Sequence, residues 1–133
     1  MKLYLASILE PENFGPGRLV GVANGNKPYN INIVCKYDHL TPKSSLQEQY
    51  YSTLKEKSQQ EASEGFVNGF VDQLNGFYNK VMTAAKSKNV SVISLLPFQD
   101  GDTLVSWERK ANTHYRGLIA EVLKKLGYEI IEN

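Results

Sequence analysis

The residues best suited to chemistry in this chain stand in the sequence NTHYRG, over residues 112–117. They directly precede LIAEVLKKLG, whose apolar spacing predicts an amphipathic helix. A helix N-terminus presents unpaired N–H groups and a partial positive charge, so it favours an anion such as phosphate. Arg116 adds a planar guanidinium that can bind phosphate through two hydrogen bonds. We therefore expect an anion site at this point of the chain.

A purely structural role explains the same residues without a ligand. In that alternative Asn112 or Thr113 caps the helix, and Arg116 is solvated or paired with Glu108. However, a cation near a helix N-terminus is slightly unfavourable for the helix itself. Arg116 and His114 are therefore better explained if an anion offsets their charge.

Three short strands are predicted before residue 40, and they supply the first part of a sheet. Lys2–Ser7 is short and apolar, Arg18–Asn24 follows a loop rich in proline and glycine, and Ile31–Tyr37 alternates apolar and polar positions. Cys35 falls inside the third of these strands, so we expect its thiol to be buried and inert.

Helices are predicted for the middle of the chain, up to about Lys88. Ser44 or Ser45 is the expected cap, with Gln47 or Glu48 completing a capping box, and a break is expected within KEKSQQEASEG. The apolar residues of the second helix recur at spacings of four, four, three and four, at Phe66, Phe70, Leu74, Phe77 and Val81. Three interior glycines, at 65, 69 and 76, indicate close approach of another backbone or a strained helix.

The C-terminal third reads as a strand, a helix and a strand. Val90–Phe98 is continuously apolar, as a central parallel strand would be, and the helix is expected from about Asn112 to Leu126. Gly127 suits the left-handed position after a helix, and Tyr128–Glu132 closes the chain as a strand. We predict one α/β domain over residues 1–133, with three layers and a short, mostly parallel sheet flanked by helices.

Ligands of open α/β sheets bind beyond the carboxyl ends of the strands. Aromatic side chains there would stack on a nucleotide base, and cations would hold its phosphate. The amide of Asn24 or Asn26 would form hydrogen bonds with the polar edge of the base. The predicted ligand-binding residues are Arg116, Tyr115, His114, Thr113, Arg109, Trp107, Phe98, Asn24, Phe14 and Arg18.

No complete catalytic or metal-binding pattern is present, and we predict no catalytic residue, metal or cofactor. The chain has no G-x-S-x-G, P-loop or G-x-G-x-x-G sequence, and its two histidines and single cysteine lack zinc-site spacing. Only Asp100, Asp102 and Glu108 offer a carboxylate that could act as acid or nucleophile near the expected site.

Composition excludes several classes of partner. The chain has 133 residues, of which 41% are hydrophobic and 22% charged, with a net charge of +1. This charge argues against nucleic acid and against an anionic membrane surface as partners. No apolar run reaches the roughly 18 residues that span a bilayer, no targeting segment is seen, and one cysteine suits a reducing cytoplasm.

The C-terminal part resembles a known family. VISLLPFQDGD followed by HYRGLIAEVLKKLGYEIIE is similar to the end of the domain of unknown function 488 family, in which Cys-His-Arg opens the last helix. His114 and Tyr115 stand where that family has cysteine and histidine, and Arg116 matches its arginine. The resemblance implies a small α/β domain with an anion or nucleotide site near this helix. Loss of the reactive Cys-His pair favours binding over catalysis.

Three functions remain open from the sequence. The first is a non-catalytic, homo-oligomeric protein that binds or sequesters a nucleotide-like small molecule, in the manner of a phage protein that captures a host immune signal. The second is an enzyme acting on an N-glycosidic or phosphate bond of a nucleotide, with Glu108 or Asp102 as the reacting carboxylate; the first strand, LYLAS, is also similar to that of nucleoside deoxyribosyltransferases. The third is an interaction module that blocks a host protein.

Overall fold

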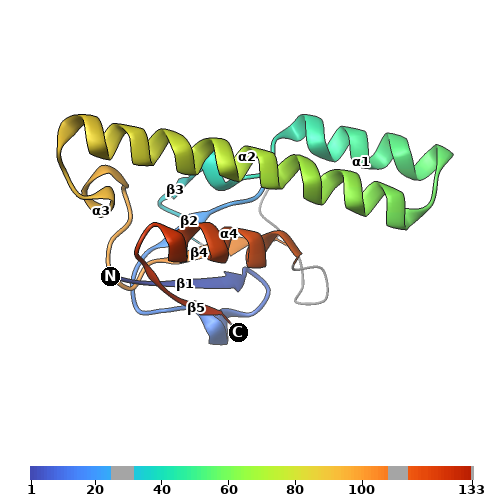
Figure 1. The fold of residues 1–133 in the computed structure, drawn as a ribbon. Coiled ribbons are helices and arrows are strands. Elements are labelled where there is room, and N and C mark those ends of the chain that lie inside the picture. The colour runs from blue at the N-terminus through green and yellow to red at the C-terminus, as the bar shows by residue number, and fades with distance from the viewer. Residues whose placement is uncertain (25–31, 108–113, 133) are drawn as a thin grey trace.

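A computed structural model describes residues 1–24, 32–107 and 114–132, except for the side chain of residue 114. Among these residues, three short strands come first, three helices follow, and a strand, a helix and a strand end the chain (Figure 1). In order they are β1 (Lys2–Ser7), η1 (Pro11–Asn13), β2 (Leu19–Gly21), β3 (Cys35–Lys36), η2 (Asp38–Leu40), α1 (Ser44–Glu56), α2 (Gln59–Lys88), α3 (Val92–Leu95), β4 (Thr103–Ser106), α4 (His114–Lys125) and β5 (Glu129–Glu132).

All five described strands run parallel, in the order β3-β2-β4-β1-β5. The centre of the sheet is β4, which pairs with β2 on one side and with β1 on the other. Since α4 connects β4 to β5, the chain crosses over β1 to reach the far edge of the sheet. The predicted α/β class and parallel sheet are confirmed.

The long helices α1, α2 and α4 lie on the same side of the sheet in Figure 1. Strand side chains that point to this side, Leu3, Leu5, Val20 and Leu104, are buried in one core with apolar residues of α2 and α4. Burying a side chain of this size is worth about 1.5–3 kcal/mol, so this shared core holds the helices on the sheet.

The opposite side of the sheet is covered by the segment between β1 and β2. The Gly15 N–H donates to the hydroxyl of Thr103 over 2.8 Å, and a Cβ added at Gly15 would lie 2.2 Å from the ring of Tyr4. Only a glycine allows the backbone to approach the tyrosine ring so closely. The PENFGPG loop thus supplies the layer that the helices leave out on this side.

The break predicted between the two middle helices is confirmed. The α1 helix ends at Glu56, and Ser58 caps α2 by accepting the N–H of Glu61 over 3.2 Å. The expected serine cap of α1 is wrong, because Lys43 occupies the cap position and no side chain caps it. Its N–H instead donates to Oε1 of Gln73, which lies on α2.

The apolar periodicity of α2 buries the predicted face, with Phe70, Leu74, Phe77 and Val81 in the core and Phe66 half-buried. Close approach is found at only one of the three glycines. A Cβ added at Gly69 would lie 2.3 Å from Cδ2 of Leu46 on α1, whereas Gly65 and Gly76 face open space. Gly69 therefore permits the contact between α1 and α2.

The strand predicted at Val90–Phe98 is wrong. Ser91 caps the short helix α3, its hydroxyl accepting the N–H of Ser94, and Leu96 and Phe98 enter the core as single side chains. The central strand is Thr103–Ser106 instead, and all four of its residues are buried. Its two hydroxyl groups made it look like a loop, but each has a hydrogen-bond partner inside the protein.

The strands β2 and β3 are shorter than predicted, and the expected burial of Cys35 is also wrong. Cys35 lies on the edge strand β3, where it is exposed. Its side chain fails to be covered because β3 pairs on one side only, with β2. Within the described part of the chain, no helix is both long and apolar enough to cross a membrane.

Candidate functional site

The carboxyl ends of β1 and β4 meet the start of α4. Ser7 and Ser106 end their strands in register with each other, and both are buried. The α4 helix begins at His114, after residues 108–113, which the structure does not describe. This is the edge of a parallel sheet at which α/β proteins bind ligands.

Arg116 lies at this edge with its side chain directed into the protein. The residue is 5% exposed, and its Nη1 donates to the hydroxyl of Ser106 over 2.9 Å. Ser106 is one of the partners of this guanidinium, which makes further contacts. A buried guanidinium keeps its charge at every accessible pH, so this edge of the sheet carries a permanent positive charge.

Trp107 directly follows Ser106. Its side chain lies on the face of the sheet opposite to α4 and Arg116. A Cβ added at Gly21 would be 3.5 Å from Cη2 of Trp107, so the indole ring lies beside the backbone of β2. The indole Nε1 is buried and has no hydrogen-bond partner among the described residues. A buried N–H of this kind costs about 1–3 kcal/mol unless an acceptor reaches it.

Tyr115 belongs to the core, which corrects its expected role as a stacking platform. The residue is 6% exposed, and its ring makes edge-to-face contacts with Phe66 and Phe70 at centroid distances of 6.5 and 5.7 Å. A ring that stacks on a ligand needs an open face, whereas Tyr115 is buried against Phe66 and Phe70 of α2. Tyr115 thus holds the start of α4 against α2.

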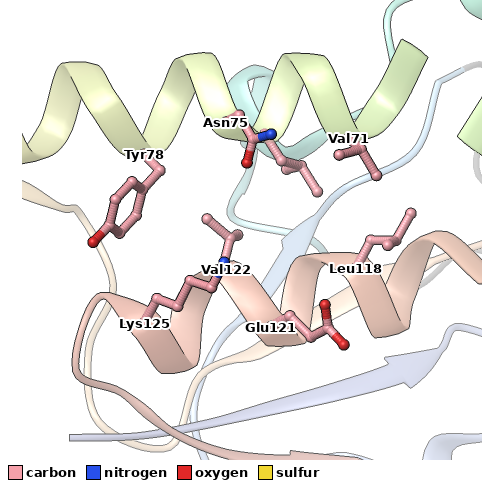
Figure 2. Close-up of a pocket in the computed structure, with 8 residues that line it drawn as sticks. Val71, Asn75, Tyr78, Leu118, Glu121, Val122 and Lys125 are labelled. Atoms are coloured by element: carbon pink, nitrogen blue, oxygen red, sulfur yellow. The ribbon is translucent and has the colours of Figure 1, made fainter. Parts of the chain in front are cut away.

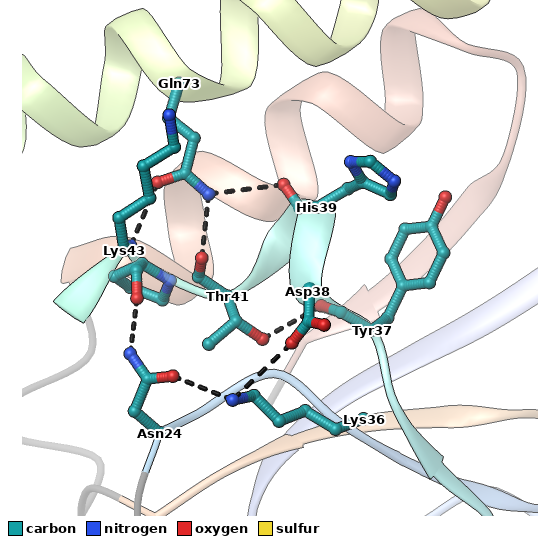
Figure 3. A network of polar contacts seen from close by, with 9 residues as sticks. Asn24, Lys36, Tyr37, Asp38, His39, Thr41, Lys43 and Gln73 are labelled. Carbon is teal, nitrogen blue, oxygen red and sulfur yellow. Dashed lines mark hydrogen bonds and ion pairs between the residues drawn. The ribbon is translucent and has the colours of Figure 1, made fainter.

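Asn24 follows β2 at the same edge, but its amide already has partners (Figure 3). Its Nδ2 donates to the carbonyl of Pro42, and its Oδ1 accepts from Nζ of Lys36 over 2.8 Å. The same lysine lies 3.5 Å from Oδ1 of Asp38. The expected reading of a ligand's polar edge by Asn24 is corrected to a structural link between β2 and the segment before α1.

Gln73 extends this polar network to α2. Its Nε2 donates to the carbonyl of Thr41 over 2.7 Å, and its Oε1 accepts the N–H of Lys43 over 3.1 Å (Figure 3). The hydroxyl of Thr41 in turn donates to the carbonyl of Tyr37. These bonds satisfy the polar backbone of the loop between η2 and α1, so the network has a structural role.

Arg18 and its partner Asp102 directly precede β2 and β4. They therefore lie at the amino ends of the parallel strands, which is the edge of the sheet opposite to Arg116. Nη2 of Arg18 lies 2.7 Å from Oδ2 of Asp102, and its Nε donates to Oδ1 over 3.2 Å. This paired geometry is the fork that arginine makes with a carboxylate. Arg18 is therefore removed from the expected ligand site and assigned to a structural ion pair.

Asp102 is fully buried, and it accepts backbone N–H groups as well as the guanidinium. The N–H of Gln99 donates to Oδ2 over 2.9 Å and that of Arg18 to Oδ1 over 3.1 Å. Burial raises the pKa of Asp102, but the hydrogen bonds from Arg18 and Gln99 outweigh it, so the pKa is lowered. The carboxylate stays ionised and fully occupied, which is unsuited to a general acid.

Asp100 is also at the amino edge, where its Oδ1 accepts the N–H of Lys2 over 2.7 Å. The expectation that Asp100 and Asp102 stand at the ligand-binding edge is therefore wrong, and it failed because the central strand was placed before these residues. Glu108, the third candidate acid, lies outside the described residues.

Phe98 is likewise corrected from a ligand contact to a core residue. Its ring packs edge-on against Tyr37 and Tyr128 at centroid distances of 5.0 and 6.1 Å. Phe14 follows η1 and is half-buried on the segment that leads to Gly15. Thr113 and Arg109 lie outside the described residues, as does Asn26, and the side chain of His114 is not described.

Two site residues, Ser7 and Ser106, were missed by reasoning from the sequence. Each is the last residue of a strand, and buried serines at that position of a parallel sheet could have indicated the edge once β4 was known. In the described part of the chain, no group of three or more histidine, cysteine or acidic side chains is placed to hold a metal ion.

Comparison of the chain with protein-family models, with curated proteins and with solved structures finds no match.

Proposed function

We propose that the protein binds a phosphate-bearing, nucleotide-like small molecule, without cleaving it, at the carboxyl edge of its sheet around Arg116. The observation that carries the proposal is the buried guanidinium of Arg116, held by the hydroxyl of Ser106 where β1, β4 and α4 meet. A charge fixed in a low-dielectric place attracts an anion much more strongly than a charge in water.

Three further features support the same place. The N-terminal end of α4, a helix of 12 residues, contributes a partial positive charge. The buried Nε1 of Trp107, one residue after Ser106 but on the other face of the sheet, would gain an acceptor from a ligand that extends around the carboxyl edge from Arg116. Arg116 stands where the domain of unknown function 488 family has the arginine of its Cys-His-Arg sequence, and this resemblance supports the same end of α4.

The ligand would be held mainly through its anionic part. Tyr115 and Phe98 are core residues, so Trp107 is the aromatic side chain in the described part of the edge that is left to contact a flat ring. Binding without cleavage is favoured over the nucleotide-processing alternative because Asp102, one of the two carboxylates named for that reaction, is bound at the opposite edge, as is Asp100. Capture of a host signalling nucleotide by a phage-type protein is the role that such binding would serve.

A ligand panel tests this proposal. The protein is incubated with mononucleotides, dinucleotides and cyclic nucleotides, its thermal unfolding is measured, and the ligand is then released by heat and identified by mass spectrometry. We expect at least one phosphate-bearing compound to raise Tm and to be recovered intact, while the matching nucleoside without phosphate does not raise it. Recovery of an altered product supports the enzyme instead. No shift with any phosphate-bearing compound contradicts the proposal.

A further inference from the structure

A shallow groove with an apolar floor and polar side chains around it lies between α2 and α4 (Figure 2). Its floor consists of Val71, Leu74, Leu118 and Val122. The cavity volume is about 100 Å³, well below the roughly 300 Å³ at which small-molecule sites begin. The groove is therefore too small for a nucleotide and better suited to a side chain from another protein surface.

The rim of the groove carries one acid and one base at helical spacing. Glu121 and Lys125 stand four residues apart on α4, both are exposed, and neither forms an ion pair with another described residue. Asn75 and Tyr78 form the facing rim on α2. When a second copy of α4 packs antiparallel to the first, the acid of each helix can lie opposite the base of the other.

The two helices point the same way, since Val71 lies beside Leu118 and Tyr78 beside Lys125 in Figure 2. Met82 stands one helical turn beyond Tyr78 on α2, and it is 40% exposed. An exposed methionine next to an apolar groove is a suitable side chain to fill the same groove of a second molecule, because it is unbranched and adapts its shape.

We infer that this groove is the interface of a homodimer, in which two copies pack their α2–α4 faces antiparallel about a twofold axis. In this arrangement Glu121 lies opposite Lys125 of the partner subunit, and Lys125 lies opposite Glu121 of the partner subunit. The same axis brings Met82 of the partner subunit toward Val71. A twofold interface must be self-complementary, and the charge pair on α4 meets that condition.

The size of the face sets the expected strength. The α4 helix spans 12 residues, or about 18 Å, so two helices of this length offer less than the roughly 800 Å² per partner of a standard stable interface. We therefore expect a reversible dimer with a Kd of roughly 1–100 μM. The inference is independent of the ligand proposed above, which binds at the end of the sheet.

Sedimentation velocity over about 1–500 μM of the full chain tests the interface. Glu121→Lys and Lys125→Glu each place like charges opposite one another, so each is expected to weaken the dimer at least about tenfold. The double variant restores opposite charges across the axis and is expected to return to within about threefold of the wild type. Met82→Glu is expected to weaken the dimer as well.

Lys80→Glu is the matched control, because Lys80 is an exposed lysine of α2 that does not line the groove. It is expected to leave the dimer unchanged, and far-UV circular dichroism verifies that every variant is folded. A protein that stays monomeric over the whole range overturns the inference. A dimer that ignores both single reversals, or that the double variant fails to restore, places the interface elsewhere and overturns it too.

Discussion

Nη1 of Arg116 donates to the hydroxyl of Ser106 over 2.9 Å, which ties the start of α4 to the end of the central strand β4. Both residues are buried. This hydrogen bond places a permanent positive charge at the carboxyl edge of a parallel sheet, and it is the feature on which both the local structure and the proposed ligand site depend.

Ser106→Ala removes the hydroxyl from this pair. Because a buried charged donor then loses an acceptor, we expect the free energy of unfolding to fall by about 1–2 kcal/mol. Urea unfolding followed by tryptophan fluorescence measures the change. Ser87→Ala on the exposed side of α2 is the matched control and should not lower stability. A Ser106→Ala protein as stable as the wild type would show that this bond contributes nothing.

Asp102→Asn replaces one of two acceptor oxygens by a donor, although both oxygens accept hydrogen bonds here. We expect a loss of roughly 1.5–3 kcal/mol at neutral pH, as for a hydrogen bond to a charged group. Because the pKa of Asp102 is lowered in the folded protein, its contribution is present above the unfolded value, near 3.9, and disappears as the pH falls below it.

The acid branch of stability against pH checks this assignment. Between about pH 4 and pH 2 the wild type should lose stability more steeply than Asp102→Asn, since only the wild type takes up a proton at this position on unfolding. Chemical denaturation at a series of pH values gives both slopes. Parallel acid branches for the two proteins would contradict the role of Asp102.

Tyr128 is the opposite case, a buried group whose polar atom is unsatisfied. Its hydroxyl has no hydrogen-bond partner among the described residues. Burial, with a smaller effect of Tyr37, raises its pKa to about 12. Since the unfolded value is near 10, stability should fall by about 2–3 kcal/mol as the pH rises from 10 to 12.

Tyr128→Phe removes both effects at once. At pH 7 we expect stability to be unchanged or raised by up to about 1 kcal/mol, because no hydrogen bond is lost with the hydroxyl. The alkaline loss should be smaller in the variant than in the wild type, although burial also raises the pKa of Tyr37, which contributes to it in both proteins. A destabilisation of Tyr128→Phe beyond about 1 kcal/mol at pH 7 would show that the hydroxyl has a partner.

The glycines of α2 separate helix propensity from packing. Gly65→Ala and Gly76→Ala meet open space, so each should raise stability by about 0.5–1 kcal/mol. Gly69→Ala meets Cδ2 of Leu46 and forces that side chain to move, so its gain should be smaller or reversed. Thermal unfolding of the three variants compares them directly. Equal gains at all three positions would contradict the contact between α1 and α2.

The elements predicted well from the sequence are those with strong periodicity. The spacing from Phe70 to Val81 identified the buried face of α2, and the φ of Gly127, +108°, confirms the predicted turn after α4. The strand predicted at Val90–Phe98 was wrong because a mainly apolar run also suits a short helix followed by a loop that buries single side chains, as α3, Leu96 and Phe98 show. Thr103–Ser106 was overlooked because its hydroxyl groups find partners only through contacts with Gly15 and Arg116, which are distant in sequence.

The misplaced strand also explains the errors at the site. Because the central strand was predicted at Val90–Phe98, Asp102 was expected after its carboxyl end. In the structure Asp102 precedes β4, so Asp102 and its partner Arg18 lie at the amino edge. Arg116 was placed at the correct edge because α4 and β5 were predicted correctly. Burial of Tyr115 depends on Phe66 and Phe70, and no local pattern around residue 115 reveals that contact.

The affinity of Arg116→Lys for a phosphate-bearing ligand tests the central claim most directly. Lysine keeps the charge but loses the planar fork, so we expect the Kd, measured by isothermal titration calorimetry with a ligand from the panel, to rise at least about tenfold. Arg18→Lys, which alters the arginine of the opposite edge, is the matched control and should bind within about threefold of the wild type. Binding that survives Arg116→Lys unchanged while the variant remains folded would contradict the site.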